Sequence, residues 1–199
     1  MSTLVCQSAP EFTAAAVMAD GSINENFSLA DYRGKYVVLF FYPLDFTFVC
    51  PSEIIAHHKR VAEFEARGAQ VIGVSIDSQF THFAWRNTPV ENGGIGDIGF
   101  PLVADVNHNI VQSYGVEHPD GVALRGSFLI DKEGTIQHAV VNNLPLGRNV
   151  DEMLRLVDAL QFTEEHGDVC PAGWQKGDNA MTPTAEGVAS YLSENASNL

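Results

Sequence analysis

The sequence predicts an α/β fold in which helices flank a central mixed sheet and a C-terminal arm follows. Two apolar runs that lack polar alternation, residues 36–42 and 71–76, indicate strands buried on both faces. A helix is expected between them over about residues 51–67, and the connections on either side are short. Strand, helix and strand in this order favour a right-handed parallel crossover, which forms the centre of an α/β sheet.

The chain ahead of the first run is expected to be extended or to form a short strand. Turns are predicted at Asp20-Gly21 and at Arg33-Gly34, where glycine follows a polar residue. Residues 28–32 are consistent with one helical turn that Ser28 caps with its hydroxyl. We therefore expect this segment to lead into the sheet and not to form a separate domain.

The residues that end the first strand and begin the helix place a cysteine at the helix N-terminus. Pro43 stops the strand, and Pro51 suits the first turn of a helix, where its missing N–H had no partner. Gly68 suits the position after the last turn. Cys50 then lies where unpaired N–H groups and the positive end of the helix dipole favour an anion such as a thiolate. We expect a nucleophilic thiol at Cys50, with Thr47 facing the same pocket, and the alternative is a small buried hydrophobe.

The remaining segments alternate between helical and strand patterns. They predict a helix capped by Ser78 at 79–87, a glycine-containing loop at 88–100, a strand at 101–105, a helix at 107–114, an antiparallel hairpin of 125–131 and 136–141, an amphipathic helix at 149–162 and a last helix at 184–192. After Gly167 the chain becomes polar and extended. We therefore predict a thioredoxin-like domain over residues 1–166 and a C-terminal arm over residues 167–199.

Composition and charge exclude several classes of protein. The 199 residues are 45% hydrophobic and 18% charged, which are globular values, and the net charge of −14 argues against binding to nucleic acid or to anionic membranes. No apolar run approaches the ~18 residues of a membrane span. The apolar stretch at 12–19 has no Lys or Arg ahead of it, since the first is Arg33, so a signal peptide is not indicated. We expect a cytoplasmic protein.

Cysteine and histidine usage indicates neither a disulfide framework nor a metal site. Cys6, Cys50 and Cys170 are too few and too scattered for a structural framework, and no CxxC motif signals a zinc site or an adjacent dithiol. The seven histidines are dispersed, and adjacent residues such as His57-His58 point apart on a helix. We expect neither a metal nor another cofactor.

Two motifs resemble those of a known family. Pro43, Thr47 and Cys50 fit the PxxxTxxC pattern of peroxiredoxins, and Cys170, in a Val-Cys-Pro sequence 120 positions later, resembles the second cysteine of the typical two-cysteine subfamily. The resemblance extends from residues 9–12 to the final helix. It is strongest to bacterial members of the thioredoxin-dependent, alkyl hydroperoxide reductase type, in the phrases GVSIDSQFTHFAW, PLVAD and ALRGSFLID.

The resemblance implies a role for each residue of the first motif. Cys50 would attack the peroxide as a thiolate, and Thr47 would accept a hydrogen bond from the peroxide while donating one toward the sulfur. Arg125 would hold both thiolate and peroxide with its planar, permanently charged guanidinium. Pro43 would shield the sulfur from water. Taken singly, Arg125 is equally consistent with a surface turn, Thr47 with a cap and Pro43 with a strand terminator.

The resemblance also implies supporting residues, a second chemical step and partners. Glu53 and Arg148 would steady Arg125. Cys50 would become a sulfenic acid, which Cys170 would convert to a disulfide. In the resembled family the two cysteines come from different subunits of an antiparallel homodimer, and dimers also close into decameric rings. The disulfide would be reduced by thioredoxin or by a flavoprotein disulfide reductase. Cys6 has no counterpart in the pattern.

Two other functions compete with a thiol peroxidase. A protein disulfide oxidoreductase uses the same type of fold, but the absence of CxxC counts against it, because a rapid dithiol switch needs adjacent sulfurs. An assembly or holdase-type chaperone is the third possibility, and it would keep its function without Cys50.

Overall fold

The computed structural model describes residues 3–198, which divide into two compact units. The first, here called unit 1, ends at Val150, and the second, unit 2, begins at Asp151. The predicted division into a peroxidase domain over residues 1–166 and an arm over residues 167–199 concerns function as well as folding, and it stays a prediction.

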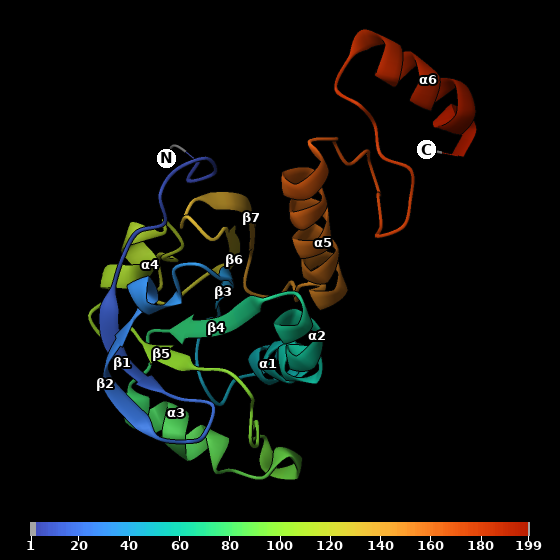
Figure 1. Cartoon of the computed structure of the whole chain (residues 1–199). Coiled ribbons are helices and arrows are strands. Elements are labelled where there is room, and N and C mark those ends of the chain that lie inside the picture. The colour runs from blue at the N-terminus through green and yellow to red at the C-terminus, as the bar shows by residue number, and fades with distance from the viewer. Residues whose placement is uncertain (1–2, 199) are drawn as a thin grey trace. The chain divides into compact units, whose positions relative to one another are not determined.

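Unit 1 is built on one seven-stranded sheet of order β2-β1-β5-β4-β3-β6-β7 (Figure 1). Neighbours β3, β4 and β5 run parallel, and the remaining pairs are antiparallel, so the predicted mixed sheet is confirmed. The strands are β1 Thr13–Val17, β2 Ile23–Ser28, β3 Tyr36–Phe41, β4 Ala69–Ser75, β5 Leu102–Ala104, β6 Arg125–Ile130 and β7 Ile136–Asn142. The N-terminal segment thus forms a two-stranded hairpin at the sheet edge, which is more than the single short strand expected.

The helix expected over about residues 51–67 is two helices. Helix α1, Cys50–Lys59, ends at Arg60, where φ −108° and ψ 3° replace the helical angles, and α2, Val61–Ala66, begins after it. The N–H of Arg60 bonds to the carbonyl of His57, so the ladder tightens to i−3 at the break. Gly68 has a φ of +65° and ends α2 as predicted.

The other short elements of unit 1 follow the sequence closely. They are α3 Gln79–Arg86, α4 Asn109–Ser113 and the 3₁₀ helices η1 Leu29–Tyr32 and η2 Val90–Asn92. Ser78 caps α3, because its hydroxyl accepts a hydrogen bond from the N–H of Thr81 at 3.2 Å. Ser28 precedes η1 but makes no side-chain cap bond, so that expectation was wrong. Ser28 is the last residue of β2 and stays paired with Thr13 in the sheet.

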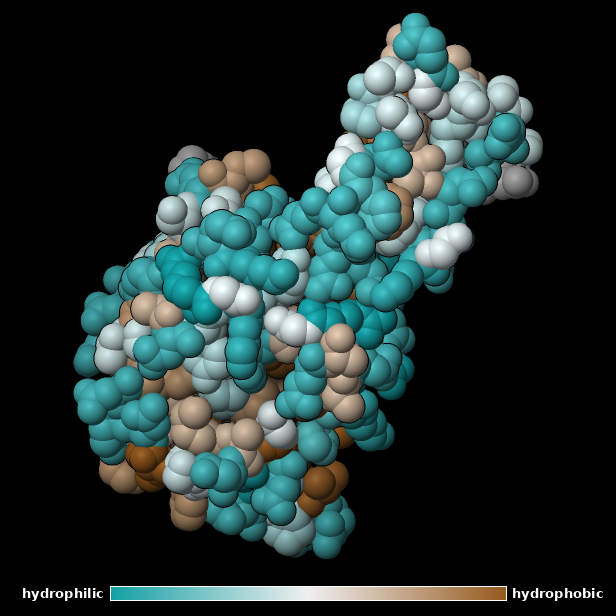
Figure 2. Space-filling view, viewed as in Figure 1, coloured by the Kyte–Doolittle hydropathy of each residue, from teal (hydrophilic) through white to brown (hydrophobic). Residues whose placement is uncertain are grey.

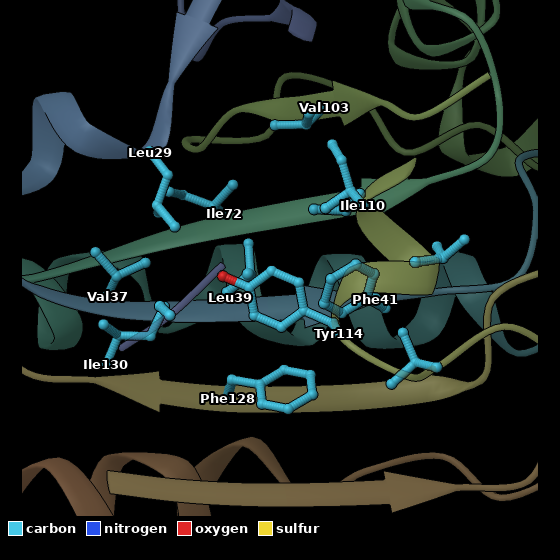
Figure 3. Packing of buried hydrophobic residues seen from close by; sticks show 14 of the residues in the cluster. Leu29, Val37, Leu39, Phe41, Ile72, Val103, Ile110, Tyr114, Phe128 and Ile130 are labelled. Carbon is cyan, nitrogen blue, oxygen red and sulfur yellow. The ribbon is translucent and has the colours of Figure 1, made fainter. Parts of the chain in front are cut away.

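The core of unit 1 lies on both faces of the sheet. Side chains alternate along β3, so Val37, Leu39 and Phe41 pack into one cluster with Ile110 and other residues (Figure 3). The ring of Phe40 points the other way and stacks on His57 of α1, with ring centroids 4.2 Å apart. The strand is therefore buried on both sides, and α1 is fixed against its second face.

Unit 2 contains two helices joined by an irregular segment. Helix α5, Val150–His166, runs four residues past the expected end and stops before Gly167, whose φ is +74°. An antiparallel bridge joins Val169 to Met181 in the irregular segment. Helix α6, Ala185–Asn195, begins after Thr184, whose hydroxyl accepts from the N–H of Gly187, and the 3₁₀ helix η3, Ala196–Asn198, follows.

The surface of unit 1 is mostly polar with local hydrophobic exposure. Hydrophilic residues cover much of the face in Figure 2, and hydrophobic ones lie among them over the region of β2 and α3. Phe80 and Phe83 of α3 are exposed, as is Phe48 of the loop before Cys50. None of the helices within residues 3–198 is long and apolar enough to cross a lipid bilayer.

Candidate active site

Sheet topology brings separate parts of unit 1 to one edge. The loop after β3 leads directly into Cys50 and α1. Because β6 is antiparallel to β3, with Ser127 opposite Phe40, the start of β6 lies at the carboxyl end of β3. Arg125 pairs with Asn142, so the end of β7 and the loop after it reach the same edge. Cys50, Arg125 and the 143–149 loop converge there.

Cys50 is the first residue of α1, and its side chain has no exposed surface. Pro51 occupies the first turn as the sequence predicts, and the N–H groups of Ser52 and Glu53 bond to the carbonyl of Val49. The sulfur therefore lies at the positive end of the helix and is withdrawn from bulk water.

Thr47 lies against the sulfur of Cys50. Its hydroxyl oxygen is 3.0 Å from Cys50 Sγ and 2.7 Å from the carbonyl oxygen of Leu44. The hydroxyl has one proton, so it donates to one of these two atoms at a time. When Cys50 is a thiol, the thiol donates to Thr47 and Thr47 donates to Leu44. When Cys50 is a thiolate, the Thr47 proton is available to the sulfur.

Arg125 contacts the sulfur from the other side of the site. Its Nη1 is 3.6 Å from Cys50 Sγ and donates to Glu53 Oε2 at 2.7 Å, and its Nε donates to the carbonyl of Leu144 at 2.6 Å. The side chain is buried. A guanidinium held by two acceptors in fixed positions has little freedom to leave the sulfur, so the surface-turn alternative for Arg125 is wrong.

Glu53 and Arg148 complete the charged cluster. Glu53 Oε1 accepts from the backbone N–H and the Nε of Arg148, both at 2.8 Å, and Oε2 accepts from Arg148 Nη2 at 2.9 Å. Burial alone would raise the pKa of Glu53, but hydrogen bonds and charge from Arg148, with the charge of Arg125, lower it below its usual value. Glu53 is therefore an anion at neutral pH.

The charge of this buried cluster is unbalanced without the sulfur. Two guanidinium groups, of Arg125 and Arg148, surround one carboxylate, which leaves one positive charge. An uncompensated buried charge is unfavourable, and a thiolate at Cys50 would neutralise it. The cluster thus places one excess positive charge beside the sulfur of Cys50.

Pro43 follows the end of β3 and is buried. The strand ends at Phe41, so Pro43 is a strand terminator, as one interpretation of the sequence had it. Its role as a shield for the sulfur stays a prediction.

Sequence reasoning missed a buried polar network under the loop that carries Thr47. Asp45 accepts from the hydroxyl of Tyr42 at 2.9 Å and lies 2.7 Å from His82 Nδ1, and its N–H donates to Asp77 at 2.9 Å. Burial raises the pKa of Asp45, although the hydrogen bond and charge of His82 oppose this. The next residue, Phe46, has a φ of +53°, which is unusual for a bulky side chain. The network therefore fixes the loop in a strained conformation.

Cys170 has a looser environment within unit 2. It is half-buried, and its thiol lies 3.6 Å from the carbonyl oxygen of Ala159 and 3.8 Å from the hydroxyl of Thr163, both on α5. Cys6 is exposed. Among residues 3–198, no three His, Cys, Asp or Glu side chains are placed to hold a metal ion together.

Comparison with known proteins identifies the family. The model of the AhpC/TSA family matches residues 5–139, and the model of the C-terminal domain of 1-Cys peroxiredoxin matches residues 159–194. The chain belongs to the AhpC/TSA family. It is 58% identical over 194 residues to alkyl hydroperoxide reductase C of Helicobacter pylori strain J99, covering 97% of this chain and 98% of that one. It is 54% identical over 189 residues to mouse peroxiredoxin-2, covering 94% of each.

Solved structures agree with this assignment. The reduced 2-Cys peroxiredoxin of Plasmodium vivax superposes with a TM-score of 0.94 at 52% identity, covering 96% of this chain and all of that one. AhpC of Enterococcus faecalis gives 0.79 at 36% identity, covering 85% of this chain and all of that one. The predicted thioredoxin-like fold and the resemblance to peroxiredoxins are confirmed, and this peroxiredoxin is a thiol-dependent peroxidase.

Proposed function

We propose that this peroxiredoxin reduces hydrogen peroxide and organic hydroperoxides through Cys50, and that Cys170 resolves the oxidised sulfur. The observation that carries the proposal is the position of Cys50 Sγ, 3.0 Å from the Thr47 hydroxyl and 3.6 Å from Arg125 Nη1. The sulfur lies within a buried cluster that carries one excess positive charge.

The first step is nucleophilic attack on the peroxide. The Cys50 thiolate forms a bond to one peroxide oxygen while the O–O bond breaks, and the second oxygen leaves as hydroxide or alkoxide and takes a proton from water. Sulfur is oxidised to sulfenic acid and the peroxide is reduced. Donors fixed beside the sulfur, on Arg125 and Thr47, stabilise the negative charge that moves onto the leaving oxygen.

Glu53, Arg148 and Pro43 support that step without touching the peroxide. Arg148 binds the carbonyl of Gly126 at 2.6 Å as well as Glu53, so it connects the start of β6 to α1. Glu53 in turn holds Arg125 Nη1. Pro43, buried at the end of β3, keeps water from the sulfur.

In the second step Cys170 forms a disulfide with Cys50, and we propose that the two cysteines come from different subunits of a homodimer. Strand β7 supports a subunit interface, because it is the last strand of the sheet. Strand β6 pairs with one of its edges, and beyond Ile136, which bonds to the backbone of Cys6 and Gln7, no strand within the described residues pairs with the other edge. Val141 of β7 is exposed. An unpaired edge strand is a ready surface for a second chain. A decamer of five dimers is the assembly that we propose.

The disulfide must be reduced by an external dithiol. We propose thioredoxin as the donor, with a dedicated flavoprotein disulfide reductase as the second candidate. A similar Plasmodium yoelii protein, 54% identical, is described as thioredoxin peroxidase I, which supports the first choice. The cytoplasmic location expected from the sequence stays a prediction.

Peroxide-dependent oxidation of NADPH in the presence of thioredoxin and its reductase tests the proposal. Wild type and Cys6→Ser are expected to turn over. Cys50→Ser is expected to be inactive, and Cys170→Ser is expected to reduce about one equivalent of peroxide and then stop. Retained turnover in Cys50→Ser would overturn the assignment of the nucleophile.

A further inference from the structure

Two side chains from neighbouring strands contact Arg148. Phe40 of β3 and Ser127 of β6 are directly opposite each other in the antiparallel pair, so their side chains share one face of the sheet. Side chains alternate along a strand, and Phe41 and Phe128, the next residues, belong to the cluster on the other face. Phe40 and Ser127 are both buried. They therefore lie on the face that α1 covers.

Each member of this pair contacts the guanidinium of Arg148. Its Cζ lies over the ring of Phe40, 5.4 Å from the ring centroid, where a cation and an aromatic face attract each other. Its Nη1 donates to the hydroxyl of Ser127 at 3.0 Å and to the carbonyl of Gly126 at 2.6 Å. The side chain of Arg148 is only 5% exposed, so water weakens these contacts little. Phe40 and Ser127 are here called the Arg148 platform.

The ring of Phe40 is itself fixed by other rings. His57 of α1 stacks on it with an interplanar angle of 2°, and Phe100 meets it edge-on with ring centroids 5.7 Å apart. Burial and the charge of Arg148 lower the pKa of His57 to about 4, although its hydrogen bond to the Glu53 carbonyl opposes this. His57 is therefore neutral at pH 7 and adds no further positive charge to the cluster.

The platform leaves two nitrogens of Arg148 for Glu53. Nε donates to Oε1 at 2.8 Å and Nη2 donates to Oε2 at 2.9 Å, and such a forked pair fixes the planes of both groups. Oε2 of Glu53 also accepts from Arg125 Nη1 at 2.7 Å, and this same nitrogen lies 3.6 Å from Cys50 Sγ. A continuous series of contacts therefore connects the platform to the sulfur.

We propose that the Arg148 platform positions the Arg125 guanidinium for the oxidation of Cys50. The two platform residues act through Arg148 and Glu53, and they are positioning residues. The inference rests on the proposed role of Cys50 as the nucleophile. In the step concerned, the thiolate sulfur bonds to one oxygen of hydrogen peroxide while the O–O bond breaks. The second oxygen leaves as hydroxide and takes a proton from water.

The platform affects this step through geometry and not through charge. A guanidinium that is fixed in advance stabilises the charge on the leaving oxygen without reorganisation during the reaction. When the platform is removed, the guanidinium of Arg148 gains freedom to rotate, and Glu53 is held less firmly against Arg125. The net charge of the cluster does not change. The expected loss of rate is therefore smaller than for a change in Arg125 itself.

The test measures the second-order rate constant for oxidation of Cys50 by hydrogen peroxide in the full chain. Rapid-quench alkylation followed by mass spectrometry counts the Cys50 thiol that remains. Phe40→Leu keeps an apolar side chain but removes the aromatic face, and it is expected to slow oxidation about fivefold. Ser127→Ala removes one acceptor of Arg148 and is expected to slow oxidation about threefold.

Phe41→Leu is the matched control, because it makes the same substitution at the next position of β3, on the other face of the sheet. Phe41 has no exposed surface, like Phe40, and its ring centroid lies 5.2 Å from that of Tyr114 and 5.8 Å from that of Phe128. Urea unfolding should show similar losses of stability in the two leucine variants. The rate constant of Phe41→Leu should stay within about twofold of wild type, because this residue does not contact the charged cluster.

A double-mutant cycle shows whether the platform acts through Arg148. Arg148→Gln removes the group that the platform orients, so adding Phe40→Leu or Ser127→Ala to it should cause little further loss of rate. Losses that multiply in the double variants would overturn the inference. If Phe40→Leu does not fold, Ser127→Ala and its cycle with Arg148→Gln decide the question alone.

A wild-type rate in either folded platform variant would also overturn the inference, as would an equal loss of rate in Phe41→Leu. If hydrogen peroxide leaves the Cys50 thiol of wild type unmodified, the proposed function fails and not this inference alone. Normal oxidation of Cys50 in wild type, with the same rate in the platform variants, means that only the inference fails.

Discussion

The two cysteines that we propose for the reaction occupy opposite kinds of environment. Cys50 in unit 1 is fully buried beside a hydroxyl and a guanidinium, and that guanidinium is itself held by a carboxylate and a backbone carbonyl. Cys170 in unit 2 is half-buried, and its sulfur makes long contacts of 3.6 Å to Ala159 and 3.8 Å to Thr163. A sulfur that attacks a peroxide needs hydrogen-bond donors fixed beside it, because negative charge moves onto oxygen in that step. A sulfur that reacts with a second sulfur must instead be accessible to it.

The largest difference between the two units is expected in how strongly a carboxylate–arginine pair stabilises the folded protein. Glu53 is buried between Arg125 and Arg148, and Glu152 of unit 2 is half exposed beside Arg155. Glu53→Gln leaves two buried cations without their anion, so we expect it to lower the free energy of unfolding by about 3 kcal/mol or more. Glu152→Gln should lower it by less than about 1 kcal/mol. Urea unfolding followed by circular dichroism measures both, and equal losses would contradict the comparison.

A second difference should appear in the pH dependence of stability. His57 in α1 bonds through Nδ1 to the carbonyl of Glu53 and is buried, and burial lowers its pKa to about 4. Between pH 6.5 and about 4 the unfolded chain therefore takes up a proton that the folded chain does not. Stability should fall as pH falls through this window, by up to about 3 kcal/mol at its lower end.

His166 of α5 provides the matched control for this measurement. It makes the same type of contact, from Nδ1 to the carbonyl of Phe162, and stacks on that residue, but it is exposed. His57→Gln should flatten the dependence of the unfolding free energy on pH between 4 and 6.5, and His166→Gln should leave it as in wild type. A wild-type curve that is already flat would refute the role of His57.

The third effect concerns the rate of the first step. Arg125→Lys keeps the charge but loses the planar fork that bonds to Glu53 and the Leu144 carbonyl while touching the sulfur. We expect the second-order rate constant for Cys50 oxidation to fall about 100-fold. Stopped-flow measurement in a Cys170→Ser background isolates this step. A loss of less than about threefold would show that charge alone is sufficient.

The smallest effect compares the two threonines that lie beside the sulfurs. Thr47 is 3.0 Å from Cys50 and Thr163 is 3.8 Å from Cys170. Thr47→Val keeps the shape and removes the hydroxyl, and it should slow oxidation about tenfold. Thr163→Val should change the resolution rate by less than about twofold, because a long contact to sulfur is weak. Rapid-quench kinetics measures both rates, and a larger loss in Thr163→Val than in Thr47→Val would contradict the comparison.

What the sequence predicted well has a local signal. The apolar run of β3, the proline after Cys50 and the glycine after α2 each encode their own backbone conformation, and the structure has them as expected. The roles of Arg125, Glu53 and Arg148 came from the resemblance alone, since no periodicity or spacing connects residues 72 to 95 positions apart.

What the sequence did not predict depends on tertiary contacts or on backbone atoms. Arg125 donates to the carbonyl of Leu144, and Thr47 donates to the carbonyl of Leu44. Every residue has a backbone carbonyl, so the sequence does not show which one accepts these bonds. Asp45 and His82 are 37 positions apart, and each alone is consistent with an ordinary surface residue. No proline or glycine in the sequence marks the break between α1 and α2. The break results from the backbone angles of one residue, Arg60.

The anchoring of Glu53 limits how far the sulfur of Cys50 can travel. A second thiol reaches this buried sulfur only when the first turn of α1 unwinds, since the side chain has no exposed surface. Glu53, held by hydrogen bonds from Arg125 and Arg148, remains the fixed end of the released segment. Glu53 is three positions after Cys50, so the fully extended tether between them spans about 10 Å. The incoming thiol must be delivered inside that radius, and a longer reach would require the charged cluster itself to break.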